Sequence, residues 1–203
     1  MAPEIGETEV LRHKQSLTSK YPTATVVNKE RKVGDELLTE LKQYSKDGYP
    51  ELKDYSEDGY IGASYALVVR TEEASASKES DDERSALLVL THDSNEWDVP
   101  GGGREEGGSF EETAVREVQE ETGISCQIID CQLIEHRVTV ADGHPERLHT
   151  LWTYFSGEYV DGSIAIKEDE LDGAAWFSTF PERISSATAE FEDWASKTES
   201  SNQ

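Results

Sequence analysis

Cysteine and basic residues are scarce in this sequence, and long apolar runs are absent. The two cysteines, Cys126 and Cys131, are too few for a disulfide framework. Their spacing, followed by His136, His144 and His149, matches no common structural zinc site, so we interpret both as free, reduced thiols. No segment approaches the run of roughly 18 apolar residues that a membrane helix requires. The sequence therefore predicts neither a disulfide-stabilised scaffold nor a membrane-spanning protein.

The first ten residues lack the features of a secretory signal. They contain three glutamates and no basic cluster ahead of an apolar core. We therefore expect a soluble, cytoplasmic protein with no membrane partner.

Positive charge is heavily outnumbered, with 19 basic against 43 acidic residues and a net charge of −24. Such a charge repels nucleic acids and anionic membranes within the Debye length, so we expect no nucleic-acid partner. A small phosphorylated substrate is still compatible with it, because a bound divalent cation can invert the local field. The excess of acidic residues also suggests a halophilic protein, since high salt screens the self-repulsion.

The hydrophobic pattern changes near residue 60. Residues 1–60 are polar and predicted to be mostly helical, with apolar stripes at 10–17 and 35–44 and a turn-rich linker at 47–59, and their role is unassigned. Residues 61–203 are predicted to form one domain. Apolar, β-branched segments predict strands at 64–70, 85–91, 96–99, 125–133, 135–140, 148–159 and 174–177. An acidic loop is expected at 71–84, and an amphipathic C-terminal helix at 181–197.

A helix in the middle of the chain carries a cluster of acidic side chains. The capping-box pattern Ser109-x-x-Glu112 predicts its start, and Gly123 predicts its end. Glu117, Glu120 and Glu121 then share one face, where like charges cost about 0.2–0.5 kcal/mol per pair. A cation would offset this repulsion, and carboxylates suit Mg²⁺ or Mn²⁺. The alternative is an acidic surface that is merely solvated.

The residues around this helix resemble a known family motif. Pro100-Gly-Gly-Gly103 precedes the helix, and Arg116-Glu-Val-Gln-Glu-Glu-Thr-Gly-Ile124 forms its end. Residues 102–124 resemble the Nudix box, Gly-x5-Glu-x7-Arg-Glu-U-x-Glu-Glu-x-Gly-U, where U is aliphatic, and eight of the nine specified positions match. The departure is Gly108, where the family has glutamate; Glu105, Glu106 or Glu111 are candidates to replace it.

This resemblance implies an α/β/α sandwich around a mixed β-sheet and Mg²⁺-dependent hydrolysis, with Mn²⁺ as the alternative ion. The substrate class implied is a nucleoside diphosphate linked to another moiety. The metal ligands would be Glu117, Glu120, Glu121 and the Gly102 carbonyl, with Arg116 orienting Glu117. Arg116 has a simpler alternative, an ordinary helix ion pair with Glu112 or Glu120.

Other residues are candidates for substrate contacts and for the general base. Gly101, Gly102, Gly103 and Arg104 are expected to bind substrate, since glycines let the backbone approach a phosphate closely. Glu170, in an acidic loop, is similar to a family glutamate that completes the metal site or acts as base. Trp152 and Tyr154 are candidates to stack on a nucleobase or, more simply, to pack in the core.

Two further readings of the sequence stay open. The strings at 59–62, 148–150 and 173–177 also resemble Nudix proteins of salt-loving archaea, which would account for the net charge. The alternative function is a Nudix-fold protein that binds a nucleotide, or regulates through it, with weak catalysis. The sequence does not identify which diphosphate is cleaved, and a homodimer is compatible with it.

Overall fold

The computed structural model describes residues 4–34, 61–72, 83–92, 95–104, 108–143, 145, 147–167 and 169–191. Its helices are α1 (Glu7–Lys20), α4 (Phe110–Thr122) and α5 (Ser186–Ala189). Its strands are β1 (Glu4–Ile5), β2 (Thr25–Val33), β3 (Gly62–Glu72), β4 (Glu83–Thr91), β5 (Trp97–Asp98), β6 (Gly101–Gly103), β7 (Ile124–Ala141), β8 (Arg147–Gly162) and β9 (Leu171–Phe177). The helix expected at 35–44, the linker at 47–59 and most of the loop at 71–84 lie outside the described residues.

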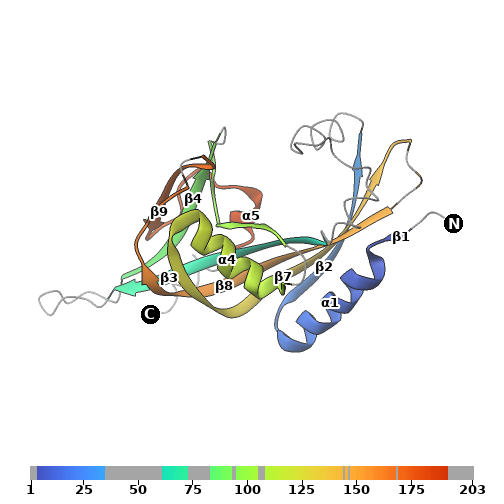
Figure 1. Ribbon diagram of the computed structural model, residues 1–203, viewed down its shortest axis with the longest axis horizontal. Helices are drawn as coiled ribbons and strands as arrows, with labels where there is room; N and C mark the ends of the chain where they lie inside the picture. The colour runs from blue at the N-terminus through green and yellow to red at the C-terminus, as the bar shows by residue number, and fades with distance from the viewer. Residues whose placement is uncertain are drawn as a thin grey trace, which may run out of the picture.

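One mixed sheet forms the middle layer of the molecule (Figure 1). Its strands are ordered β2-β7-β8-β3-β4-β5, while β1 pairs with β8, β6 with β3 and β9 with β4. The pairs β2–β7, β3–β8 and β1–β8 are parallel, and the others are antiparallel. With α1 and α4 on one face and the short α5 on the other, the architecture is the expected α/β/α sandwich with a mixed sheet.

The helices α1 and α4 bury their apolar stripes against the same face of the sheet (Figure 1). Val10 of α1 and Phe110 and Val118 of α4 are almost fully buried, and they share a core with Phe155 of β8. Burying an apolar side chain of this size contributes roughly 1.5–3 kcal/mol. This shared core fixes the position of α4, and with it the acidic face of the helix.

The N-terminal segment contains more than the helix predicted from its apolar stripe. Helix α1 confirms that stripe, but residues 25–33 form strand β2, which pairs in parallel with β7 over its full length, from Thr25 opposite Leu133 to Val33 opposite Ala141. The prediction of a mostly helical segment is therefore incomplete. The segment is part of the sheet, because β2 supplies its edge strand.

The expected strands of the later chain are all present, with shifted ends. The two segments expected at 125–133 and 135–140 form one strand, β7, whose pairing with β8 shifts register at three places. The irregularities let a single strand curve beneath α4 rather than break into two. Strands β1 and β6 were not predicted, because two or three residues are too few to show a pattern.

The C-terminal helix begins five residues later than the predicted start at residue 181. Residues 181–185 are not helical, and α5 begins at Ser186, behind the capping side chain of Ser185. The preceding residues pair with β5 instead: Trp97 N donates to the Arg183 carbonyl, and Ser185 N donates to the Trp97 carbonyl. Residues 192–197 of the predicted helix lie outside the described part. No helix in the described ranges is both long and apolar enough to cross a membrane.

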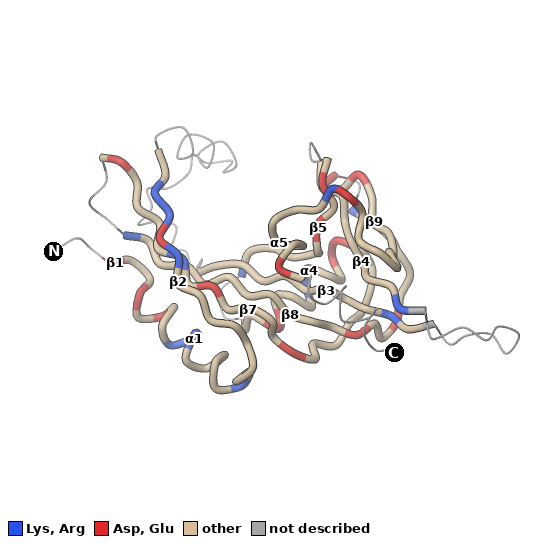
Figure 2. Tube along the Cα trace, turned by 180° about the vertical axis from the view of Figure 1, so that it is seen from behind, with Lys and Arg blue, Asp and Glu red and all other residues tan. Residues whose placement is uncertain are grey.

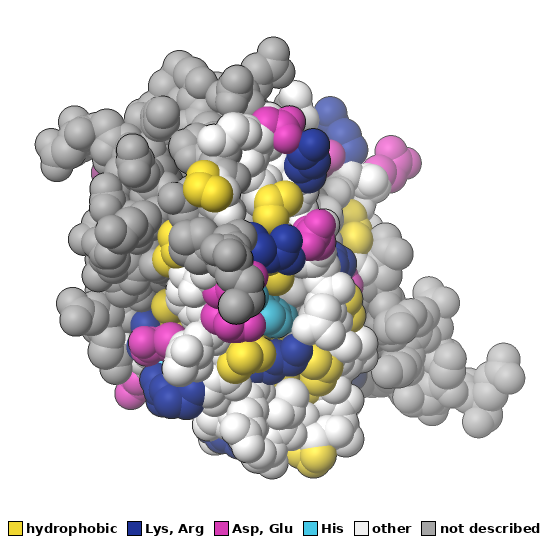
Figure 3. Space-filling model, turned by 90° about the vertical axis from the view of Figure 1, so that its right-hand side faces the viewer, with side chains coloured by type: hydrophobic (Ala, Val, Ile, Leu, Met, Phe, Trp, Pro, Cys, Tyr) yellow, Lys and Arg dark blue, Asp and Glu magenta, His cyan; other side chains and the backbone are white. Residues whose placement is uncertain are grey.

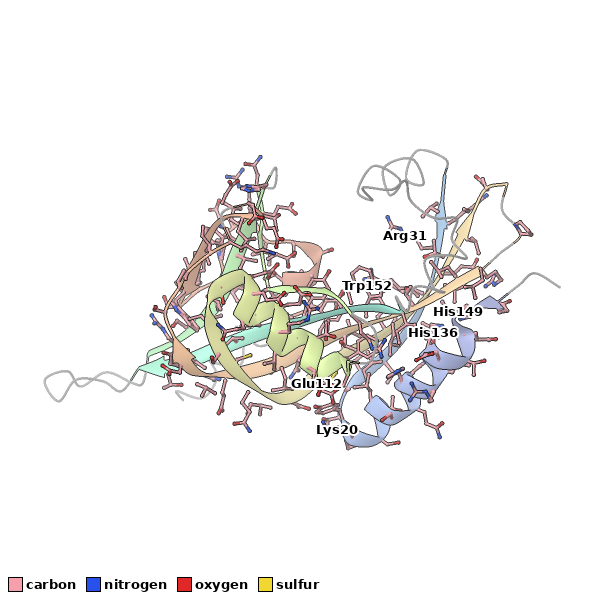
Figure 4. All side chains as sticks on the ribbon, in the orientation of Figure 1. Lys20, Arg31, Glu112, His136, His149 and Trp152 are labelled. Atoms are coloured by element: carbon pink, nitrogen blue, oxygen red, sulfur yellow. The ribbon has the colours of Figure 1, made fainter. Side chains whose placement is uncertain are left out.

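Two buried histidines join β1 to the middle of the sheet, and Figure 4 labels both. His136 Nε2 lies 2.9 Å from His149 Nδ1, and His149 Nε2 lies 2.7 Å from a carboxylate oxygen of Glu4. Burial, followed by the neighbouring His149, lowers the pKa of His136 to about 4. His136 is therefore neutral near pH 7, as a buried hydrogen-bonded link requires. Cys126 and Cys131 are free, as predicted, and both are buried.

Candidate functional site

The acidic helix face lies against the glycine strand. Helix α4 starts with the predicted capping box, in which Ser109 Oγ accepts from Glu112 N at 3.1 Å and Glu112 Oε2 accepts from Ser109 N at 2.8 Å. It ends at Gly123, whose φ of 72° is the left-handed conformation that glycine adopts most easily. Strand β6 pairs with β3, from Tyr65 opposite Gly101 to Ala63 opposite Gly103. The two motif segments, strand β6 and helix α4, are also in contact with each other.

Glu121 is the acidic residue held most tightly at this contact. Its Oε2 accepts a hydrogen bond from Gly101 N at 3.1 Å. Burial, together with the nearby charges of Glu117, Glu170 and Asp98 and against the lowering effect of the Gly101 bond, raises the pKa of Glu121 to about 8. Without a positive charge beside it, Glu121 therefore favours its neutral form near pH 7.

Glu117 contacts the backbone of the same glycine strand. A Cβ atom at Gly102 would lie within 2.5–2.7 Å of the carboxylate atoms of Glu117, so only glycine leaves room for the side chain there. A Cβ atom at Gly101 would lie 2.4 Å from the Ser64 carbonyl oxygen and 2.5 Å from the Tyr65 ring. The two positions therefore require glycine for different reasons. Gly102 leaves space for the Glu117 carboxylate, and Gly101 leaves space for the neighbouring strand β3.

Arg116 connects the helix, the glycine strand and two of the acids. Its guanidinium donates to Glu117 Oε1 at 2.7 Å, to Glu120 Oε2 at 2.9 Å and to the Gly103 carbonyl at 3.0 Å. Arg116 therefore contacts Glu117 and also forms the helix pair with Glu120, and its role in orienting Glu117 stays a prediction. Its bond to Gly103 adds a link that the sequence did not indicate.

Glu117, Glu120 and Glu121 are neighbours on the helix face, but their carboxylates do not converge on a common point. Glu117 is largely buried and Glu120 is half exposed, and both point toward Arg116. In the ranges that the structure describes, no group of three His, Cys, Asp or Glu side chains is arranged as a formed metal site.

Glu170 and Asp98 contribute charge from outside the helix. Glu170 is exposed, and Lys167 Nζ donates to its carboxylate at 2.5 Å. Asp98 was not predicted: it is partly buried and accepts from Ser185 Oγ at 2.5 Å and from Thr188 Oγ1 at 3.1 Å. Its position two residues before Pro100 and the glycines was the only sequence signal for it. Both residues act on Glu121 through their charge.

Arg104 lies under the segment before α4 instead of pointing to the acids. It is 8% exposed, donates from Nε to the Gly108 carbonyl at 2.6 Å, and lies 5.9 Å from the centre of the Phe110 ring. This is a structural position, and a contact between Arg104 and substrate stays a prediction.

Glu105, Glu106 and Glu111 are the candidates to replace the glutamate that Gly108 lacks, and the structure describes one of them, Glu111. Glu111 Oε1 accepts from Lys20 Nζ at 2.8 Å, and Tyr21 of the same α1 end lies close to it. Glu111 is therefore directed to α1. Glu105 and Glu106 lie outside the described residues.

The aromatic candidates on β8 differ in their surroundings. Tyr154 is 3% exposed and packs against Phe191, which fits the core alternative. Trp152, labelled in Figure 4, is only partly buried. Its ring is stacked with that of Tyr65 at 5.9 Å between centroids, and Tyr65 itself contacts the glycine strand.

Comparison with known proteins gives one family and several partial likenesses. A family model, the NUDIX domain, matches residues 73–191. The NAD-capped RNA hydrolase NudC of Pseudomonas aeruginosa is 35% identical over 74 residues, which are 36% of this chain and 24% of that protein, so the match spans about a quarter of the relative.

Solved structures are similar at lower identity. A NUDIX hydrolase from Nitrosomonas europaea is 22% identical, with a TM-score of 0.45 over 68% of this chain and 89% of that one. An ADP-ribose pyrophosphatase from Streptococcus suis 89-1591 is 16% identical, with a TM-score of 0.44 over 70% of this chain and 92% of that one.

Proposed function

The chain belongs to the NUDIX domain family, and from that premise we propose that it hydrolyses a diphosphate linkage in a nucleoside diphosphate linked to another moiety. The observation that carries the proposal is the contact between the acidic face of α4 and the glycine strand. Glu121 accepts from Gly101 N, and Glu117 occupies the space that a Cβ at Gly102 would fill. Carboxylates held beside a bare backbone leave a place for a phosphate and its counter-ion.

The residues present fit a divalent cation, and we propose Mg²⁺, with Mn²⁺ as the alternative. A carboxyl whose pKa is raised to about 8 by burial and by neighbouring acids is stabilised as an anion when a cation binds beside it. Glu117, Glu120 and Glu121, with the Gly102 carbonyl, would hold the ion. When bound, such an ion polarises a phosphoryl oxygen, neutralises the leaving phosphate and lowers the pKa of an attacking water.

The protein's own side chains position these groups. Arg116 orients Glu117 through the 2.7 Å bond and anchors it to Gly103. The proton of the attacking water would pass to Glu170 or to a glutamate of α4. For Glu170, this requires that the Lys167 ammonium, which now donates a hydrogen bond to its carboxylate at 2.5 Å, move away.

The small size of the substrate is part of the proposal. The relative NudC is named for NAD-capped RNA, but the match covers about a quarter of it. A net charge of −24 opposes the approach of a long polyanion, so we propose a small nucleotide-like substrate and no nucleic acid. The same charge supports a cytoplasmic protein of a high-salt cell, where the repulsion is screened.

A hydrolysis screen tests the activity. Nucleoside di- and triphosphates, ADP-ribose, NADH and dinucleoside polyphosphates would each be incubated with Mg²⁺ or Mn²⁺. The matched control is Glu120→Gln, which removes one ligand charge from an exposed position without a buried contact. We expect turnover of at least one diphosphate by the wild type and a loss of about a hundredfold or more in the variant.

Two outcomes would contradict the proposal in different ways. Wild-type turnover in Glu120→Gln would remove the assignment of the acidic face as the metal site. Nucleotide binding without turnover on the whole panel would favour the alternative, a nucleotide-binding or regulatory protein in which Gly108 replaces a functional glutamate.

A further inference from the structure

Lys167 is a cation at the edge of the proposed site, and the proposed function requires only that it leave Glu170. Its Nζ donates to Glu170 Oε1 at 2.5 Å, and its side chain is 44% exposed. An ammonium has three N–H donors, and Glu170 is its one partner in the part of the chain that the structure describes. Two further donors of Lys167 therefore have no acceptor among these residues.

The turn that carries Lys167 is tied to the end of α4. Ala165 N donates to the Thr122 carbonyl at 2.9 Å. On the other side of the turn, Glu170 N and Leu171 N both donate to the Lys167 carbonyl, at 2.9 and 3.0 Å. Two residues of chain span at most about 7 Å, so the backbone of Lys167 stays within that distance of Ala165. The lysine is therefore held beside the C-terminal end of the acidic helix.

The pair of Lys167 and Glu170 also interacts with the acids of α4 by charge. The hydrogen bond to Glu170 raises the pKa of Lys167, and the charge of Glu120 acts in the same direction. In turn, the charge of Glu170 acts on Glu121. Figure 2 shows acidic positions in red on α4 and beside β9, the strand that follows this turn. The ammonium is thus placed among carboxylates that belong to the proposed site.

Lys167 and Arg116 are different kinds of cation at these acids. The Arg116 guanidinium donates to Glu117, to Glu120 and to the Gly103 carbonyl, and its side chain is 28% exposed. A planar guanidinium with several acceptors keeps a fixed geometry, whereas an ammonium on a flexible stem with one acceptor can turn to another. Lys167 is therefore the better suited of the two to change its partner when a ligand binds.

The proposed hydrolysis demands such a change of partner. Glu170 can act as a base or a metal ligand only after Lys167 has left it, and a diphosphate brings anionic, non-bridging oxygens to the same acids. In the reaction, the oxygen of water forms a bond to one phosphorus, and the leaving phosphate takes the electron pair of the bridging bond. A cation next to that phosphate stabilises the negative charge as it develops.

We propose that Lys167 is a catalytic residue that binds a non-bridging oxygen of the scissile diphosphate, exchanging the Glu170 carboxylate for the substrate. This inference rests on the proposed function, because it assumes that a diphosphate binds beside the acids of α4. The ligand is the diphosphate itself, whatever groups are linked to its two ends. Lys167 therefore contributes to the turnover of every substrate and does not select among nucleotides.

Two binding measurements with different expected results test this role. The first probe is adenosine 5′-(α,β-methylene)diphosphate, whose methylene bridge cannot be hydrolysed. Calorimetric titration in saturating Mg²⁺ should give a dissociation constant about tenfold larger for Lys167→Gln than for the wild type. The second probe is Mg²⁺ alone. Its affinity should be equal or up to about tenfold higher in Lys167→Gln, because a competing cation has been removed from the acids.

Turnover separates the charge of the side chain from its shape. On any diphosphate that the wild type hydrolyses, Lys167→Gln should lower kcat by about a hundredfold. Lys167→Arg keeps a cation at the same place, so it should regain at least about a tenth of the wild-type kcat.

The matched control is Lys32→Gln, which changes the net charge by the same amount. Lys32 is also exposed, at 70%, and pairs with one acid, Asp142, at 2.8 Å. It belongs to β2, and Figure 1 places β2 and β9 toward opposite ends of the molecule. Figure 3 shows the end with α1, β1 and β2, where basic side chains lie among acidic ones. This variant should keep both affinities and the turnover of the wild type.

The outcomes separate this proposal from the proposed function. Weaker Mg²⁺ binding in Lys167→Gln would indicate a structural role, and an unchanged affinity for the methylene analogue would show that Lys167 does not contact the phosphates. Either result would overturn the proposal, as would equal turnover of Lys167→Gln and Lys167→Arg. If the analogue binds through Lys167 but the wild type hydrolyses no compound of the screen, the contact with the diphosphate stands and the proposed function fails.

Discussion

The ionisation of Glu121 should control the stability of the metal-free protein. Burial, with the charges of Glu117, Glu170 and Asp98, raises the pKa of Glu121 to about 8 in the folded state, while an unfolded glutamate titrates near 4.5. A group whose folded pKa is raised stabilises the protein below its unfolded pKa, and this contribution is lost as pH rises to the folded value. Glu121→Gln, a neutral isostere, should not show this loss.

The size of the effect follows from the shift. Each pH unit over which only the unfolded state is ionised costs about 1.4 kcal/mol, so the three units from pH 5 to pH 8 set a limit of about 4 kcal/mol. Glu121 is partly exposed, and solvent screening reduces this figure. We expect the free energy of unfolding of the wild type, relative to Glu121→Gln, to fall by about 2 kcal/mol over that range.

The assay is urea unfolding of both proteins in EDTA at pH 5, 6, 7 and 8. Urea is preferable to guanidinium because it does not screen charge. At pH 8, added Mg²⁺ should stabilise the wild type and have little effect on the variant, since an ion that binds only the folded state shifts unfolding by mass action. A difference that stays constant from pH 5 to pH 8, or equal stabilisation of both proteins by Mg²⁺, would refute this reasoning.

Three further predictions concern the glycines and the net charge. Gly102→Ala should fold normally but weaken Mg²⁺ activation by about tenfold, because its Cβ displaces the Glu117 carboxylate. Gly101→Ala should instead lower the melting temperature, because its Cβ lies 2.4 Å from a backbone oxygen. Melting curves and Mg²⁺ titrations of both variants distinguish these two effects. Gly108→Glu should raise turnover at limiting Mg²⁺ by about tenfold, and unchanged activation in a folded variant would show that the departure from the motif has no catalytic consequence. The melting temperature should rise by roughly 5 °C from low salt to molar KCl, and a flat or falling curve would contradict the salt-adaptation hypothesis.

The helix that carries the acids could be predicted because its signals are local. Ser109, Glu112 and Gly123 specify both ends within a few residues of the chain, and the structure confirms them. The contact of Glu121 with Gly101 could be expected only from the family motif, because it joins residues that no local rule connects.

Elements that depend on distant partners were predicted less well. Strand β2 contains the run Asn28-Lys-Glu-Arg-Lys32, which has no apolar alternation, and its structure comes from parallel pairing with β7. At the other end, Ile184 forms a bridge with Trp97, so the apolar spacing of the C-terminal segment does not start a helix until Ser186. In the site, the Lys167 pair with Glu170 and the position of Asp98 likewise follow from tertiary packing.

The parallel pairing of β2 with β7 also determines the order in which the chain can assemble. Thr25 pairs with Leu133, so among the described strands β2 finds its partner only after more than a hundred further residues have been synthesised. At about 5–20 residues per second this takes on the order of 5–20 s, during which the strand is exposed to other nascent chains. Its four consecutive charged residues, Lys29 to Lys32, oppose edge-to-edge association during that interval. The polarity that hides β2 from sequence analysis thus protects the chain while it is being made.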